Sequence, residues 1–371
     1  MENTEIRRNL DLAFLAYLGV LMVGPNIDAR LRKRLERVLG DLSETLGEWK
    51  LVWGPCTYRV TRNGIPDNTM FVAESPDRSE LVVSIAGTNP LSLYGWLVED
   101  FDVRTLYRWP HGAPPKEAMI TEGTLRGLRA LQQMVVLDHA RGGAPFPGAN
   151  TSLQVFLRQW VADRRAESPD ADLSVTVTGH SLGGALSPVV ALWLADTIGE
   201  WDPAEKVAVS CWAYAGPTPG NAAFARYITR RMGGRLYRVA NSKDVVPHAW
   251  NLDDLVELKA LYVPGLPRNR TWDRIVGLTV HNTAGTPFQQ IARPEQTHIL
   301  TGAVNDTIDH IVPLTFAKYA AQATYQHTAA YFELLDAEPH EDVQQALNTL
   351  NRASVWGILA ARVPTLQSLL F

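Results

Sequence analysis

Gly179-His180-Ser181-Leu182-Gly183-Gly184 is the stretch around which the rest of the chain is organised. The six residues before it, 173–178, alternate apolar and hydroxylic side chains with the two-residue period of a strand. Residues 185–193, which follow it, place apolar side chains at helical spacing. A strand that turns at a glycine-flanked serine and continues as a helix holds the serine hydroxyl clear of the sheet.

The flanking glycines are expected to have a steric role, because side chains at Gly179 and Gly183 would collide with neighbouring backbone in so sharp a turn. The amide of Leu182 and the dipole of the following helix favour negative charge that develops beside Ser181. The alternative interpretation is a glycine-rich strand-to-helix turn in which Ser181 merely caps the helix.

The composition is that of a globular protein with a sizeable core: 371 residues, 46% hydrophobic and 20% charged. The net charge is −4, from 35 basic and 39 acidic residues, and no basic block is present, so we expect no nucleic-acid partner. Cys56 and Cys211 are too few for a disulfide framework. No histidine or cysteine cluster has the spacing of a zinc site.

The apolar run Leu10–Gly24 raises the question of a signal peptide. Asp11 interrupts the run, no small-residue cleavage site follows it, and it is too short to cross a bilayer. We therefore predict a structural N-terminal helix, no cleavable signal peptide and no transmembrane segment. A cytoplasmic location and secretion by another route both stay open.

Strand-like and helix-like patterns alternate along the chain, which predicts an α/β fold with a mainly parallel central sheet covered by helices. We expect a single domain over 1–371 that begins with N-terminal helices in 1–50. Residues 104–122 are rich in proline and charge and predict a surface excursion, and 248–312 lack clear periodicity and predict an insertion or cap. The expected helices are 5–23, 28–46 and 151–165, and the expected strands are 57–61, 69–73, 80–86, 207–213 and 235–240.

Serine is a weak nucleophile, so Ser181 needs a base, and the base needs an orienting carboxylate. Asp244 follows the predicted strand 235–240, at the end of a sheet where ligands gather in α/β proteins. Asp244 is therefore the candidate acid. The alternative is a turn aspartate that caps its own backbone.

Four stretches resemble the class 3 lipases, the fungal-lipase-like branch of the α/β hydrolases. The most specific part is Gly-Pro-x-x-Gly-Asn-x-x-Phe followed by Asp-x-Val-Pro, whereas many hydrolases share the serine motif. The resemblance runs from about residue 80 to 250, a little under half of the chain. The stretches are 83–88 (VSIAGT), 179–184 (GHSLGG), 214–225 (YAGPTPGNAAFA) and 244–248 (DVVPH).

The resemblance implies the α/β-hydrolase fold, with helices on both faces of the sheet. It also implies that Asp244 is the acid of a Ser-His-Asp triad and that Thr88 occupies the oxyanion-hole position. Thr88 and the amide of Leu182 then supply the two donors that a tetrahedral oxyanion needs. The family more often has Arg or His where this chain has Ala86, so the chain departs from the pattern beside that hole.

The histidine of the triad is the hardest residue to assign. His327 precedes a tyrosine and a closing helix, as in the family, but 315–336 also reads as one uninterrupted helix. His298 is the second choice, because its distance from Asp244 is close to that in the smaller fungal members. His310 is a third choice, and His248 is interpreted as structural or pocket-lining.

Within the region 89–122, the stretch after Thr88 is dense in large apolar side chains. In the family this position is a short helical lid, so the resemblance implies a lid that covers the acyl pocket. The alternative is a buried core helix. The candidate lid residues are Leu91, Leu93, Tyr94, Trp96, Leu97, Val98 and Phe101.

These features together predict a carboxylic ester hydrolase, in first place a triacylglycerol lipase that works through an acyl-enzyme. A phospholipase A1 and a short-chain carboxylesterase are the nearest alternatives, and a non-catalytic scaffold that binds lipid or protein is a remote one. The expected partner is a lipid or ester substrate at a lipid–water interface. The chemistry requires no metal or organic cofactor.

Overall fold

The computed structural model of the protein describes residues 2–19, 22–59, 66–86, 105–137, 146, 148–308 and 315–349. Its strands are β1 (Lys50–Tyr58), β2 (Asn68–Glu74), β3 (Glu80–Ala86), β4 (Leu106–Arg108), β5 (Met119–Thr121), β6 (Ser174–His180), β7 (Ala208–Tyr214), β8 (Leu236–Asn241) and β9 (Thr297–Leu300).

The helices account for much of the rest of the described chain. The α-helices are α1 (Glu2–Leu15), α2 (Ile27–Asp41), α3 (Ser43–Leu46), α5 (Glu122–Gln132), α6 (Leu153–Glu167), α7 (Leu182–Asp196), α8 (Ile198–Trp201), α9 (Ala222–Met232), α10 (Leu252–Glu257), α11 (Arg270–Thr283), α13 (Thr315–His327) and α14 (Ala329–Leu334). Short 3-10 helices are η1 (Ala16–Gly19), η4 (Gly233–Arg235), η5 (Val246–His248), η6 (Leu258–Ala260) and η7 (Pro294–Gln296). Across the described ranges, no helix is both long and apolar enough to cross a membrane.

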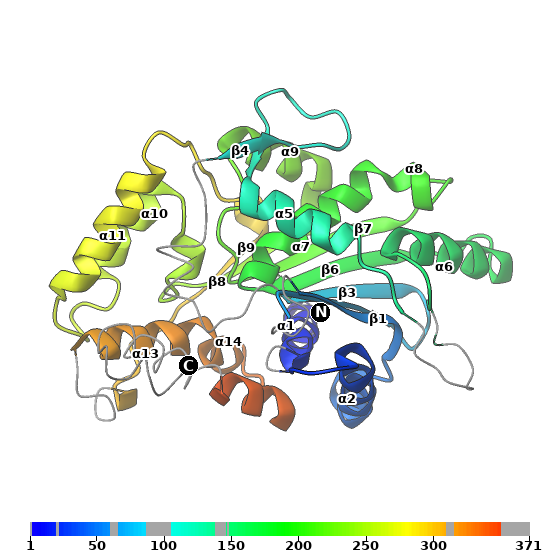
Figure 1. The fold of residues 1–371 in the computed structure, drawn as a ribbon, viewed down its shortest axis with the longest axis horizontal. Helices are drawn as coiled ribbons and strands as arrows, with labels where there is room; N and C mark the ends of the chain where they lie inside the picture. The colour runs from blue at the N-terminus through cyan, green and yellow to red at the C-terminus, as the bar shows by residue number, and fades with distance from the viewer. Residues whose placement is uncertain are drawn as a thin grey trace.

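In the part of the chain that the structure describes, the central sheet has seven strands in the order β1-β2-β3-β6-β7-β8-β9. The five strands from β3 to β9 pair in parallel, and β1 and β2 add an antiparallel edge. Figure 1 shows α5, α6, α7 and α9 on one face of the sheet and α1, α2 and α14 on the other. The predicted mainly parallel sheet with helices on both faces is confirmed.

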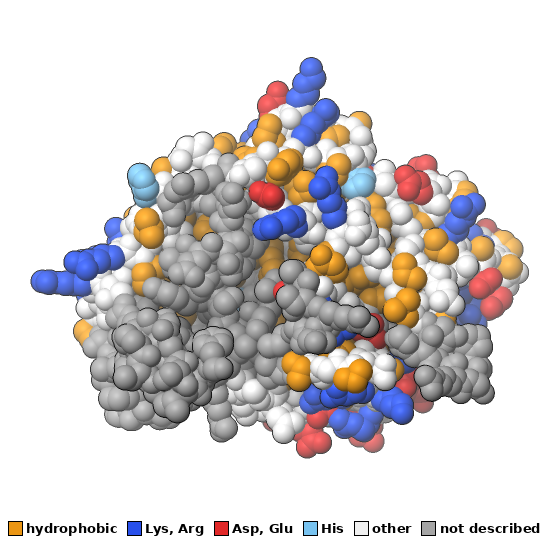
Figure 2. All heavy atoms as spheres, viewed as in Figure 1, with side chains coloured by type: hydrophobic (Ala, Val, Ile, Leu, Met, Phe, Trp, Pro, Cys, Tyr) orange, Lys and Arg blue, Asp and Glu red, His pale blue; other side chains and the backbone are white. Residues whose placement is uncertain are grey.

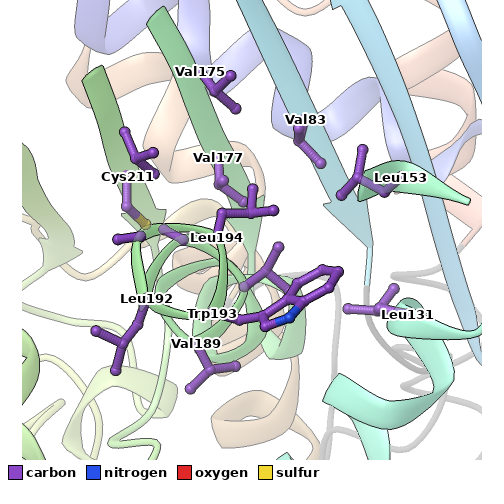
Figure 3. Close-up of a cluster of buried hydrophobic side chains, with 14 of the residues drawn as sticks. Val83, Leu131, Leu153, Val175, Val177, Val189, Leu192, Trp193, Leu194 and Cys211 are labelled. Atoms are coloured by element: carbon purple, nitrogen blue, oxygen red, sulfur yellow. The ribbon is translucent and has the colours of Figure 1, made fainter. Parts of the chain in front are cut away.

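The alternation in β6 assigns its two faces as predicted. Val175 and Val177 belong to the hydrophobic cluster under α7, which Figure 3 shows with side chains from β3, β7, α5 and α6. The hydroxylic side chains face α1 instead, where Thr178 Oγ1 donates to the carbonyl oxygen of Asn9 (3.0 Å). Ser84 of β3 does the same to the carbonyl of Leu12 (2.6 Å), so strand hydroxyls hold α1 against the sheet.

The predicted N-terminal helices are present, but the first one ends earlier than predicted. The predicted helix 5–23 is α1 followed by the tighter η1, and the amphipathic helix 28–46 is α2 with the short α3. The apolar stripe of α2 is buried in the cluster on the α1 face of the sheet. These segments therefore share the covering of one face of the sheet with α14.

The predicted strand 57–61 is wrong in its bounds, since β1 begins at Lys50 and ends at Tyr58. Gly54 and Pro55 lie inside this strand, where glycine and proline normally argue against one, and the pairing with β2 shifts register on both sides of Trp53. The irregular pairing accommodates them.

The two irregular regions contain local structure of their own. In the predicted excursion 104–122, β4 and β5 form a separate two-stranded sheet, and Trp109 is buried against the main core. In the predicted cap region 248–312, α10, η6 and α11 gather around a third hydrophobic cluster. This third cluster includes Trp250, Leu255, Leu258, Tyr262, Trp272 and Val276. It also includes Val245 and Val246 from the loop that follows β8 and carries Asp244.

The turn from β6 into α7 is packed backbone against backbone. A Cβ added to Gly183 would lie 2.2 Å from the carbonyl oxygen of Ile85, and one added to Gly179 would lie 2.4 Å from that of Gly183. A Cβ added to Gly184 would also lie 2.2 Å from a backbone oxygen, the carbonyl oxygen of Tyr214 on β7. The collisions predicted for Gly179 and Gly183 are confirmed, and they explain how α7 starts so near the sheet.

Replacing Gly183 by alanine is expected to lower the free energy of unfolding by about 2–3 kcal/mol, because the new methyl group meets rigid backbone. Gly277→Ala in α11 is the matched control, since nothing lies within 4 Å of its added carbon. That variant should gain about 0.5–1 kcal/mol from helix propensity. Urea unfolding measures both, and a Gly183→Ala protein as stable as the wild type would contradict the steric explanation.

Candidate active site

Ser181 lies at the turn between β6 and α7 in a strained conformation, with φ 60° and ψ −124°. Positive φ is uncommon for a residue with a side chain and marks functional turns. The Ser181 amide donates to the carbonyl oxygen of Tyr214 (3.0 Å), so the neighbouring strand β7 holds the turn in place. Its side chain is half-buried.

His327 is the histidine that meets Ser181. Its Nε2 lies 2.7 Å from Ser181 Oγ. The predicted alternative, an uninterrupted helix over 315–336, is wrong: α13 ends at His327 and α14 starts at Ala329, with Thr328 in a non-helical conformation. This break frees His327 from a helix interior, and its ring is buried, with 2% of it exposed.

Asp244 lies on the loop after β8 and is fully buried. Its Oδ2 accepts a hydrogen bond from His327 Nδ1 (2.8 Å), and its Oδ1 accepts one from the amide of Val246 (3.0 Å). One oxygen therefore caps the local turn, as the alternative interpretation expects, and the other faces the histidine, as a triad acid would.

These contacts suit proton transfer from Ser181 to His327. An ionised carboxylate can only accept, so Nδ1 of His327 carries the proton and Nε2 is free to accept from the Ser181 hydroxyl. The arrangement is a serine, a base in the correct tautomer and an orienting acid, linked by two short hydrogen bonds. It can remove the serine proton as the oxygen attacks an electrophile.

Tyr331 completes the surroundings of Asp244. Its hydroxyl donates to the same Oδ2 at 2.9 Å, from the first turns of α14. Burial, and then the negative charge of Asp244, raise the pKa of Tyr331 well above its usual range, so the hydroxyl stays a donor. Three hydrogen bonds therefore reach the buried carboxylate of Asp244, where an unpaired charge would be costly.

His180, next to the nucleophile, connects the two halves of the site. Its Nε2 donates to the backbone carbonyl of His327 at 2.6 Å, and the two imidazole rings lie 4.6 Å apart. Burial, and then the nearby His327, lower the pKa of His180 well below its usual range. A neutral His180 thus holds the backbone of the base without competing for its proton.

Tyr17 of η1 supports this turn from the N-terminal side. Its hydroxyl donates to the carbonyl oxygen of His180 (2.8 Å). Burial raises the pKa of Tyr17, and the nearby Ser181 side chain offsets part of that rise. The N-terminal segment therefore contributes a side chain next to the candidate nucleophile.

The structure brings Ser181, His327 and Asp244 together and leaves other predicted residues apart. His298 lies on β9 and stacks on Trp212, with ring centroids 5.8 Å apart. The Nδ1 of His248 lies 2.7 Å from the carbonyl oxygen of Asp244, in keeping with a structural role in the loop. Leu182 starts α7, so its amide has no acceptor in its own helix.

Several predicted residues lie outside the described part of the chain. They are Thr88, His310 and the candidate lid residues Leu91, Leu93, Tyr94, Trp96, Leu97, Val98 and Phe101. The described part of β3 ends at Ala86, which is in register with His180. The roles of Thr88, His310 and the candidate lid residues therefore stay predictions.

Sequence reasoning missed Tyr17 and Tyr331 as site residues. Tyr331 follows His327 by four residues, and that spacing is a usable signal. Tyr17 carries no such signal, because 163 residues separate it from its hydrogen-bond partner His180.

Comparisons with known proteins show which family and which solved structures the chain resembles. The family model described as Lipase (class 3) matches residues 82–253. The chain is similar to a solved structure described as M37 lipase, with a TM-score of 0.76 and 30% identity, over 93% of this chain and 99% of that one. The α/β-hydrolase fold expected from the sequence is confirmed by this likeness.

Curated relatives match a shorter stretch. Phospholipase A1-Igamma2 of Arabidopsis thaliana is 38% identical over 88 residues, which is 24% of this chain and 16% of the relative. Secreted mono- and diacylglycerol lipase A of Penicillium cyclopium is 39% identical over 82 residues, 22% of this chain and 23% of the relative. The chain thus aligns with less than a quarter of the length of these two relatives.

The buried, neutral His180 predicts a pH dependence of stability. Below pH ~6.5 the unfolded chain binds a proton at His180 that the folded protein does not, so the free energy of unfolding falls as the pH falls. His180→Gln keeps an amide donor toward His327 but cannot ionise. The stability advantage of the wild type over this variant should shrink by about 1.4 kcal/mol per pH unit below that value.

Urea unfolding of both proteins between pH ~5 and ~8 measures this difference, since His180 binds no proton in either state at the upper end. Parallel stability curves over the whole range would show that His180 is not neutral and buried in solution.

Proposed function

The chain belongs to the class 3 lipase family, and from this premise we propose that it hydrolyses carboxylic esters through an acyl-enzyme at Ser181. The single observation that carries the proposal is the hydrogen-bonded chain from Ser181 Oγ to His327 (2.7 Å) and on to Asp244 (2.8 Å). A non-catalytic scaffold has no need of a strained serine, a base in the correct tautomer and a buried acid in line.

In the proposed first step, His327 Nε2 takes the Ser181 proton while Oγ attacks the ester carbonyl carbon. Asp244 stabilises the imidazolium that forms, and Tyr331 and Val246 keep its carboxylate in place. His327 then protonates the leaving alcohol oxygen, which breaks the ester bond and leaves the acyl group on Ser181. Water, activated by the same histidine, releases the carboxylic acid and restores the serine.

The tetrahedral intermediate carries an oxyanion that needs two donors. We assign the backbone amide of Leu182, at the N-terminus of α7, as one donor, where the helix dipole also favours negative charge. Thr88, assigned by its place after β3, is the second. Losing one such donor typically costs about 100- to 1,000-fold in turnover.

We propose acylglycerols as the substrate class, with a triacylglycerol as the first candidate. The Penicillium relative is named for mono- and diacylglycerol, and the Arabidopsis relative for phospholipase A1 activity, so phospholipids are the second candidate. The candidate lid over 91–101 belongs to this proposal, as the element that would open at a lipid–water interface.

The test is hydrolysis of a triglyceride emulsion, phosphatidylcholine vesicles and nitrophenyl esters of increasing chain length by the purified protein. Ser181→Ala and Asp244→Asn should each lower kcat by about 10⁴-fold or more on every substrate that the wild type cleaves. Asp253→Asn is the matched control, because it removes the same charge from an exposed position on α10. Activity that survives in Ser181→Ala would rule out the proposed nucleophile.

A further inference from the structure

We propose that the outer face of α11 is the surface on which the protein docks to an anionic lipid surface. The stripe consists of Arg270, Arg274, Leu278 and His281, whose spacing of four, four and three residues places them on one side of the helix. All four are exposed, and Leu278 leaves 49% of its surface in contact with solvent. Figure 2 shows basic, hydrophobic and histidine side chains together along the left edge, over the position of α11 in Figure 1.

The opposite side of α11 is firmly seated. Trp272 and Val276 are buried in the third cluster, and the Trp272 indole donates to the carbonyl oxygen of Leu258 (2.8 Å). Val245 and Val246, which follow Asp244 directly, belong to the same cluster. The helix that carries the stripe is thus packed, through the third cluster, against the loop that carries Asp244.

The charge on this face is uncompensated. Among the described residues, neither the Arg270 nor the Arg274 guanidinium forms a hydrogen bond or an ion pair. The acid on α11, Asp273, is half-buried on the side of Tyr319. The exposed acids nearest to the stripe in the sequence are Glu257 on α10 and Glu295 on η7, so the charged side chains of the stripe itself are basic in a chain of net charge −4.

This chemistry fits an anionic lipid surface better than a second copy of the chain. A two-fold interface through the stripe would set arginines against arginines, because both partners would present the same patch. Lipid phosphates pair with arginines, and the adjoining layer accepts apolar side chains such as Leu278. The stripe offers both features on one helix.

The inference deepens the proposed function, on which it rests, by naming the surface that brings the site to its lipid. Binding to vesicles is measured without turnover, so the docking proposal can fail while the proposed ester hydrolysis holds, and the reverse. The probe is Ser181→Ala protein sedimented with vesicles of phosphatidylcholine alone or with about a third phosphatidylglycerol. We expect tight binding to the anionic vesicles, weakened by salt, and little binding to the neutral ones.

Arg270→Glu with Arg274→Glu changes four charge units and should weaken binding to the anionic vesicles about 600-fold, at roughly fivefold per charge unit near such a surface. Arg226→Glu with Arg230→Glu is the matched control, because these arginines are also exposed and four residues apart, on α9. The control should stay within about twofold of the parent protein. Leu278→Ser should cost about fivefold, a loss that salt does not remove.

Circular dichroism and the thermal midpoint establish that each variant is folded, and light scattering reports its oligomeric state. Equal loss in both double variants, equal binding to neutral and anionic vesicles, or no binding at all would overturn the proposal. A change in oligomeric state with unchanged vesicle binding would assign the stripe to a second copy instead.

Discussion

The close approach of α7 to the sheet is the constraint on which the rest of the structure depends. Gly179, Gly183 and Gly184 leave no room for a Cβ, and the turn between them holds Ser181 at φ 60°. The strain at Ser181 is tolerated because strands on both sides of β6 supply the opposing backbone. Sheet packing, and not the local sequence alone, therefore holds the nucleophile in place.

The site is completed by segments from both ends of the described chain. Tyr17 supports the carbonyl of His180 from the N-terminal side, and His180 in turn holds the backbone of His327. Tyr331 and His327 meet Asp244 from the C-terminal helices. Tyr17, His327 and Tyr331 all lie outside the stretch 82–253 that matches the family, so the matched stretch contains the proposed nucleophile and acid but not the proposed base.

Sequence reasoning succeeded where the signal is local. The period of β6, the steric need for Gly179 and Gly183, and the position of Asp244 after the strand β8 all follow from short-range rules. It placed β1 wrongly, because Gly54 and Pro55 hide a strand that only pairing with β2 sustains. It assigned His327 by resemblance alone, since the break after α13 depends on tertiary contacts that no short window contains.

The central claim is that His327, and no other histidine, activates Ser181. The most direct measurement is the rate at which a fluorophosphonate modifies the protein, with the modified residue identified by mass spectrometry. We predict modification of Ser181 in the wild type and in His298→Ala at similar rates, and a loss of about 10³-fold or more in His327→Ala. Rapid modification of Ser181 in His327→Ala, or its loss in His298→Ala, would contradict the account.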